Sequence, residues 1–119
     1  MVTLTPSFSL EALLSALDND REFAAEVMEL FLEQTPGEIQ QIQQRLEQND
    51  LTAIGGIIHA QKVAFKMFGL TEMVRLSETL GARITDKQSV AEVAPLVKQY
   101  LQTLEAELPL IQSTFNRMI

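Results

Sequence analysis

Apolar residues recur at steps of three and four along most of the chain, which is the spacing of one face of an α-helix. Prolines, glycines and short runs of Asn and Asp interrupt this pattern and mark turns between segments. The segments predict helices over about 7–17, 21–34, 36–48, 50–68 and 70–85, and a long last helix from about 89. No segment alternates with period two between turn residues, so we expect no β-sheet.

Several of the predicted helix ends carry residues that start or interrupt helices. The expected start signals are Pro6 with Ser7 or Ser9 for the first helix, Asp20 for the second, Pro36 for the third, and Ser89 with Glu92 for the last. Thr35, Pro36 and Gly37 predict a break between the second and third helices, because proline suits the first turn of a helix better than its interior. Pro109 is expected to kink or end the last helix, and residues 112–119 to fray.

The predicted fold is all-α, and residues 1–119 are expected to form a single domain. The connections are short, which favours antiparallel neighbours. The helices over 21–34, 36–48, 50–68 and 70–85 therefore predict an antiparallel up-down four-helix bundle. We expect the short N-terminal helix to cap one end of the bundle and the long C-terminal helix to pack alongside it.

The helix predicted over 50–68 carries the most distinctive side chains. On a helical wheel one arc forms the expected core-facing stripe, and it holds Gln61 together with Leu51, Ile54, Ile57, Ile58, Ala64, Phe65 and Phe68. A second, narrow arc beside it holds Gly55, His59, Lys62 and Lys66. His59 is the only histidine of the chain. Gly55 and Gly56 each cost a helix on the order of 1 kcal/mol relative to alanine, and access to the backbone beside His59 is one explanation for them.

Two interpretations of His59 follow from the residues alone. A lone histidine on a helix is more often a surface or boundary residue without chemistry. Alternatively, it is an exposed nucleophile, because an imidazole can carry a covalent intermediate and its ordinary pKa of about 6.5 leaves much of it neutral in the cell. Lys62 and Lys66 follow one and two turns later and could offset the charge of a phosphoryl group. Spacing alone does not decide between the two.

This segment resembles the signature of histidine-containing phosphotransfer (HPt) domains, roughly His-x-x-Lys-Gly-x-x-x-x-x-Gly on a bundle helix. The residues that match in register are His59, Lys62 and Gly69. Leu70 is the usual kind of residue after that glycine. Residues 26–54 are similar to the family's Phe-containing helix, proline-marked turn, second amphipathic helix and Asp-Leu lead-in. The resemblance covers about residues 10–84 well, and the last helix only in its general character.

The resemblance implies a phosphorelay function. His59 would accept a phosphoryl group from the phospho-aspartate of a receiver domain and pass it to an aspartate of another receiver, without net turnover of its own. Lys62, and less strongly Lys66, would balance the charge of the phosphoryl oxygens. The residues expected to shape the partner-docking surface are Gly55, Gly56, Val63 and Gly69. The implied partners are response-regulator receiver domains and a hybrid sensor histidine kinase, with Mg²⁺ bound by the receiver and no cofactor on this chain.

Val63 departs from the family pattern, which has a small residue, most often glycine, directly after the lysine. Val63 lies one turn beyond His59, where it is either an apolar contact for the partner or an obstacle that slows transfer. The second possibility supports an alternative function, a non-phosphorylated HPt-like adaptor that binds or inhibits a receiver or histidine kinase. A third interpretation, an unrelated helical bundle, requires the motif to be coincidental.

Composition and charge narrow the remaining functions. The formal net charge is −7, so the chain would be repelled by phosphate backbones and nucleic acid is not an expected partner. The chain has no cysteine and one histidine, which argues against disulfides and a transition-metal site. No signal peptide or membrane-spanning run is apparent, so we expect a cytoplasmic protein with no membrane association. A monomer is expected, with dimerisation through the last helix as the alternative.

Overall fold

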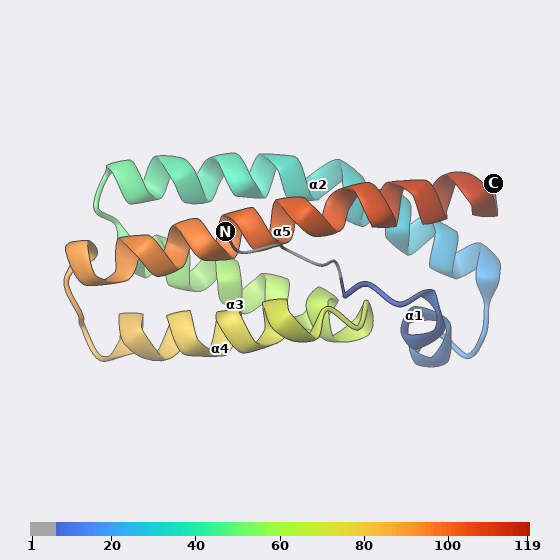
Figure 1. Cartoon of the computed structure of the whole chain (residues 1–119), viewed down its shortest axis with the longest axis horizontal. Coiled ribbons are helices and arrows are strands. Elements are labelled where there is room, and N and C mark those ends of the chain that lie inside the picture. Colours follow the sequence, from blue (N-terminus) through green and yellow to red (C-terminus); the bar gives the residue numbers. More distant parts are fainter. Residues whose placement is uncertain (1–6) are drawn as a thin grey trace, which may run out of the picture.

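The structure, a computed structural model, describes residues 7–119 and consists there of α-helices without strands (Figure 1). The helices are α1 (Leu10–Ala16), α2 (Arg21–Glu47), α3 (Leu51–Met67), α4 (Thr71–Thr85) and α5 (Val90–Met118). Each long helix runs opposite to the one before it, and α1 lies at the end of the bundle where α2 begins. α3 packs between α2 and α4, and α5 packs against both α2 and α4. The predicted antiparallel four-helix bundle is therefore confirmed.

The predicted break at Thr35, Pro36 and Gly37 is wrong, because α2 continues through them as one helix of 27 residues. Met28, Thr35 and Ile42 are all buried and lie seven residues apart, so a single core-facing stripe passes the proline without changing face. Pro36 itself is exposed. Figure 1 shows α2 bending along its length, which is how a helix accommodates a missing N–H group. The two helices predicted over 21–34 and 36–48 form one.

α5 is consequently a full member of the bundle and not an accessory to it. Pro109, expected to kink or end this helix, lies on its exposed side, and the helix continues to Met118. The expected fraying of residues 112–119 is also wrong. Ile111 and Thr114 are buried, so packing holds the final turns in helical form.

The predicted N-caps are confirmed within the described residues. The capping side chains of Ser9, Asp20 and Ser89 accept hydrogen bonds from the backbone N–H groups of Ala12, Phe23 and Glu92. Each cap satisfies a donor that has no partner inside its helix. Pro6, expected at the start of the first helix, lies outside the described residues. No helix within residues 7–119 has a stretch long and apolar enough to cross a membrane.

Glu107 on α5 holds the segment that leads into α1. Its carboxylate is buried and accepts hydrogen bonds from the backbone N–H groups of Ser7 at 2.5 Å and Phe8 at 3.0 Å. A buried carboxylate is costly unless it is hydrogen-bonded, and these donors satisfy it. The ring of Phe8 lies 5.8 Å from that of Phe68 at the end of α3. Glu107 thereby fixes α1 over the end of the hydrophobic core.

Candidate functional site

The outward face of α3 is a stripe of exposed residues spaced three or four apart. The stripe contains Thr52, Gly56, His59, Val63 and Lys66. The buried residues on the other side of the helix are Ile54, Ile58, Gln61 and Phe65. Burial of that apolar side decides which side of α3 faces the bundle, and His59, on the opposite side, therefore projects into solvent.

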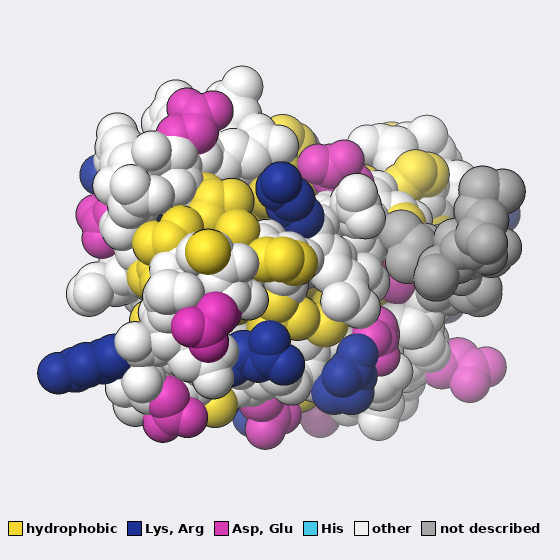
Figure 2. Space-filling model, turned by 60° about the vertical axis from the view of Figure 1, so that its left-hand side comes forward, with side chains coloured by type: hydrophobic (Ala, Val, Ile, Leu, Met, Phe, Trp, Pro, Cys, Tyr) yellow, Lys and Arg dark blue, Asp and Glu magenta, His cyan; other side chains and the backbone are white. Residues whose placement is uncertain are grey.

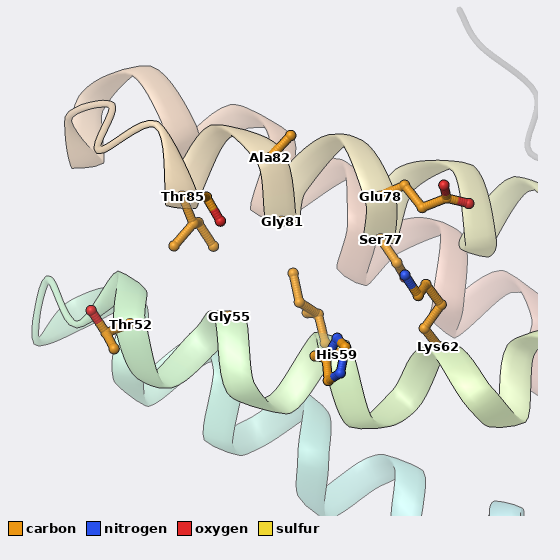
Figure 3. Close-up of a pocket in the computed structure, with 11 residues that line it drawn as sticks. Thr52, Gly55, His59, Lys62, Ser77, Glu78, Gly81, Ala82 and Thr85 are labelled. Carbon is orange, nitrogen blue, oxygen red and sulfur yellow. The ribbon is translucent and has the colours of Figure 1, made fainter.

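His59 stands at the edge of a groove between α3 and α4 (Figure 3). The groove has a volume of about 660 Å³. Its α3 wall includes Thr52, Gly55, His59 and Lys62, and its α4 wall includes Ser77, Glu78, Gly81, Ala82 and Thr85. Figure 3 shows the Lys62 side chain extending from α3 toward α4, one turn beyond His59. A group attached to the imidazole would therefore share this groove with an ammonium group.

The four residues predicted to share one arc do not all line the groove; they are Gly55, His59, Lys62 and Lys66. Gly55 and Lys62 are half-buried on the flank of α3 that faces α4, where they line the groove with His59. Lys66 is exposed and lines a different hollow, of about 280 Å³, near the end of α3. The geometry thus places Lys62 better than Lys66 for contact with an anionic group attached to His59.

The charges around His59 leave its lysines available to an anion. The ion pairs found among residues 7–119 are Arg45–Asp50 and Glu72–Arg75. Lys62 and Lys66 belong to neither. Glu78 lines the groove, but Figure 3 shows its carboxylate turned away from His59. The same part of the chain contains no cluster of three or more His, Cys, Asp or Glu side chains that could hold a metal ion.

The α4 wall of the groove was not anticipated from the sequence. Gly81 and Ala82 are small residues that leave this side of the groove open, and a Cβ atom added at Gly81 would meet no atom within 4 Å. A Cβ atom at Gly55 would meet only the two methyl groups of Ile84, at 3.5 and 3.9 Å, which are ordinary contacts. The available signal was Gly81 itself, because a glycine inside a helix costs stability that some other property must explain.

Val63, the departure from the HPt signature, is 67% exposed on the same stripe as His59. Other exposed large apolar side chains lie on α2, where Phe23 is 47% and Leu30 is 52% exposed. Both lie in the first three turns of α2, at the end of the bundle that carries α1. The site therefore combines the groove with one exposed large apolar side chain, Val63, on the stripe that carries His59.

A different face of the molecule is shown in Figure 2. Apolar side chains gather there in one area, interrupted and bordered by Lys, Arg, Asp and Glu side chains. No histidine is visible. Because His59 is the only histidine of the chain, this view looks onto a face away from the site.

Gly69, expected to shape the partner-docking surface, lies just after α3 in the left-handed region with φ of +69°. Its N–H donates to the carbonyl oxygen of Lys66 at 3.3 Å, as in a glycine C-cap. A Cβ atom at this position would come within 2.9 Å of the Ala12 Cβ atom on α1. This geometry supports a structural reason for the glycine, namely the turn and the close approach of α1. Gly56, by contrast, is exposed with open space around it.

Comparisons with known proteins agree with this geometry. Residues 26–112 match the sequence model of the Hpt domain family. A comparison with curated proteins found no match. Among solved structures, the chain is similar to the HPT domain of a hybrid sensor histidine kinase from Shewanella, with a TM-score of 0.84 and 19% sequence identity. That alignment covers 93% of this chain and 95% of the other.

The family match spans most of the chain, including α3 and both walls of the groove, and the chain therefore belongs to the Hpt domain family. Hpt domains are phosphocarrier modules rather than enzymes. Membership supports a phosphotransfer role in two-component signalling, with receiver domains and histidine kinases as the class of partner. The sequence identity to the Shewanella domain is low, so the structural similarity establishes the fold alone.

Proposed function

We propose that this chain is a phosphorelay intermediate in which His59 carries the phosphoryl group. One observation carries the proposal. The single histidine of an Hpt-family chain is exposed on the outward face of α3, at the edge of a groove that it shares with Lys62. The alternative of an inert surface histidine does not account for this placement in a member of that family.

The transfer proceeds in two displacements at phosphorus. A neutral imidazole nitrogen of His59 attacks the phosphorus of a receiver's phospho-aspartate, the N–P bond forms, and the O–P bond breaks. The aspartate leaves as a carboxylate with the electron pair of the broken bond. A second receiver's aspartate then attacks the phosphohistidine, and the imidazole nitrogen regains its lone pair. The carrier returns to its starting state, so it has no net reaction of its own.

Such a step requires positioning and charge stabilisation more than covalent work from the protein. Lys62 stabilises the phosphoryl oxygens from within the groove, and Lys66 contributes a longer-range positive field. Gly55, Gly56 and Val63 shape the surface that the receiver covers. The receiver supplies the acidic pocket and its Mg²⁺ ion, and a hybrid sensor histidine kinase is the proposed source of the phosphoryl group, in the cytoplasm.

The test is transfer of label from ³²P-labelled phospho-receivers in the presence of Mg²⁺, with wild type and His59→Gln in parallel. We expect acid-labile, alkali-stable label on wild type and none on His59→Gln. The variant should keep the circular dichroism spectrum and melting temperature of wild type, because His59 is exposed. Stoichiometric label on His59→Gln would show that another residue is the acceptor.

A pair of lysine variants tests the role of the groove. Lys62→Ala should slow transfer on the order of tenfold, which corresponds to about 1.4 kcal/mol of lost transition-state stabilisation. Lys98→Ala is the matched control, because Lys98 is an exposed lysine on α5 outside the groove. It should transfer at the wild-type rate. Equal slowing in both variants would mean that net charge, and not Lys62, matters.

Val63 favours a second candidate function, an adaptor that binds a receiver without taking up phosphate. Its side chain is 67% exposed one turn beyond His59, where a partner approaches. This function predicts measurable receiver binding with no label on wild type, and label on Val63→Gly. Val63→Ala controls for the added flexibility of glycine. Label on wild type would exclude the adaptor as the sole function.

A further inference from the structure

Gln61 is the one polar side chain on the buried stripe of α3, two residues after His59. It is 6% exposed among apolar neighbours. Each polar atom of its amide nevertheless has a hydrogen-bond partner. The Tyr100 hydroxyl on α5 donates to its Oε1 atom, and its Nε2 atom donates to Glu38 Oε1 on α2 at 2.9 Å. One side chain of α3 thus joins three helices of the bundle through directional bonds.

The Tyr100 hydroxyl of this network is buried and stays protonated. Tyr100 is fully buried, and its ring lies 6.1 Å from that of Phe65. Burial raises the pKa of Tyr100 far above its ordinary value, and the hydroxyl of Ser77, which lines the His59 groove, lowers it only in part. The Tyr100 hydroxyl therefore remains a donor at any physiological pH, and the Gln61 oxygen always has a partner.

The rest of the α3 stripe provides no comparable directional anchor. Ile54, Ile58 and Phe65 bury apolar surface, and apolar contacts tolerate small rotations because they are non-directional. Successive residues of a helix differ by about 100°, so Gln61 and His59 lie about 200° apart, on nearly opposite sides of the helix. Fixing the Gln61 amide therefore fixes the direction in which His59 leaves the helix.

The sensitivity of His59 to this angle is large. A side-chain tip lies roughly 6 Å from the helix axis, so a rotation of about 10° moves it by about 1 Å. A misplacement of about 1 Å in a reacting group can cost about 100-fold in rate. An anchor that holds the rotation of α3 within a few degrees would therefore be visible in the rate of transfer.

We propose that Gln61 is a positioning residue, which sets the rotation of α3 through Tyr100 and Glu38 and so aims His59 at the incoming phosphoryl group. The proposal rests on the proposed function of His59. It assigns no direct contact with the phosphoryl group to Gln61, because Gln61 lies behind the helix and not in the groove.

The test uses the double variant Gln61→Met/Tyr100→Phe, which removes both polar groups while nearly preserving their volumes. Gln61→Met alone would remove the acceptor that the buried Tyr100 hydroxyl has in Gln61 and is expected to lower the melting temperature. The double variant should melt within a few degrees of wild type, since it removes the Tyr100 hydroxyl together with its acceptor, and the only group that loses a partner is the half-buried carboxylate of Glu38. We expect its single-turnover transfer at saturating receiver to be about tenfold slower, with little change in receiver affinity.

Variants at Glu38 and Thr103 distinguish an effect on the orientation of His59 from an effect on the stability of the fold. Glu38 is only half-buried, so Glu38→Ala should fold well and slow transfer severalfold, and Glu38→Gln should restore the rate because an amide oxygen still accepts from Gln61. Thr103→Val is the matched control. Its buried hydroxyl bonds only the carbonyl oxygen of Gln99 in its own helix, at 2.8 Å. Thr103→Val should transfer at the wild-type rate.

Transfer by the double variant within twofold of wild type would overturn the positioning role, as would equal slowing by Thr103→Val. Proton NMR of the imidazole provides an independent result. The His59 ring resonances should shift in the double variant and not in Thr103→Val, and unchanged resonances would also overturn the proposal. If wild type takes up no label, the proposed function fails, whereas the NMR result still decides whether Gln61 sets the orientation of His59.

Discussion

Replacing Gly69 with alanine should destabilise the fold while leaving the chemistry of His59 in place. Gly69 has φ of +69°, a conformation that side chains with a Cβ atom rarely adopt. The new Cβ atom would lie 2.9 Å from the Ala12 Cβ and 3.5 Å from the Ser9 Cβ. Neither neighbour is the far end of a flexible side chain, so the new atom displaces α1 as a whole.

The magnitude follows from these two effects. A left-handed conformation costs an L-residue about 1–2 kcal/mol. Forcing an extra carbon into a packed contact costs about 1–3 kcal/mol when neighbours must shift. The sum is about 2–5 kcal/mol, a large fraction of the stability of an ordinary domain. α1 is held by Glu107 and by Phe8 against Phe68, so it cannot move away freely.

Urea denaturation followed by circular dichroism measures this loss. With a slope of about 2 kcal/mol per molar urea, the middle of the usual range, the midpoint should fall by roughly 1–2.5 M. Gly69→Ala combined with Ala12→Gly removes the close contact but keeps the strained φ, so it should recover part of the loss. Gly81→Ala is the matched control, because its Cβ atom meets nothing, and it should stabilise the helix by about 0.5–1 kcal/mol.

The reasoning is refuted if Gly69→Ala unfolds at the same urea concentration as wild type or a higher one. At low temperature, where the variant is folded, its phosphoryl uptake should be near that of wild type. Gly69 follows His59 by ten residues, a rise of about 15 Å along the helix. A folded variant without uptake would instead support the expectation that Gly69 contacts the partner.

Three shorter predictions address other parts of the structure. Gly81→Leu should fold normally and slow phosphoryl uptake severalfold by filling the groove beside His59; unchanged uptake would show that the partner does not enter the groove. Glu107→Ala should lower the free energy of unfolding by about 2 kcal/mol, because two backbone N–H groups lose a buried acceptor, and an unchanged urea midpoint would contradict this. The hydrogen bond from Arg75 holds the pKa of Glu72 in the folded protein below its ordinary value of 4.5. The pair therefore adds to the free energy of unfolding above pH 4.5, and this contribution is lost as the pH falls through the pKa of Glu72 in the folded protein. The small difference in urea midpoint between wild type and Glu72→Gln should therefore shrink from pH 7 to pH 3, and a constant difference would refute the pairing.

Much of the helical fold could be predicted from local patterns. Helix type, the turns at 18–20, 49–50 and 86–88, and the caps at Ser9, Asp20 and Ser89 depend on side chains a few residues apart. The two errors share one cause. Pro36 and Pro109 disfavour helix locally, but each lies on the exposed side of a helix whose other side is buried over its whole length. The free energy of that burial comes from contacts with residues distant in sequence. A local sequence pattern therefore cannot show that burial outweighs the cost of the proline.

For the candidate site, the residues alone nominated His59 as the acceptor that we propose, because it is the one histidine of the chain and its spacing from Lys62 and Gly69 matches a family signature. Which lysine shares the groove with His59 depends on the packing of α4, because a helical wheel places Lys62 and Lys66 in the same arc and only Lys62 lies on the flank that faces α4. The tertiary structure also decided the partners of Gln61, whose polar side chain on an apolar arc had no explanation within its own helix. Contacts between helices are set by the packing of whole faces, and a periodicity within one helix specifies which face is buried but not which residues it meets.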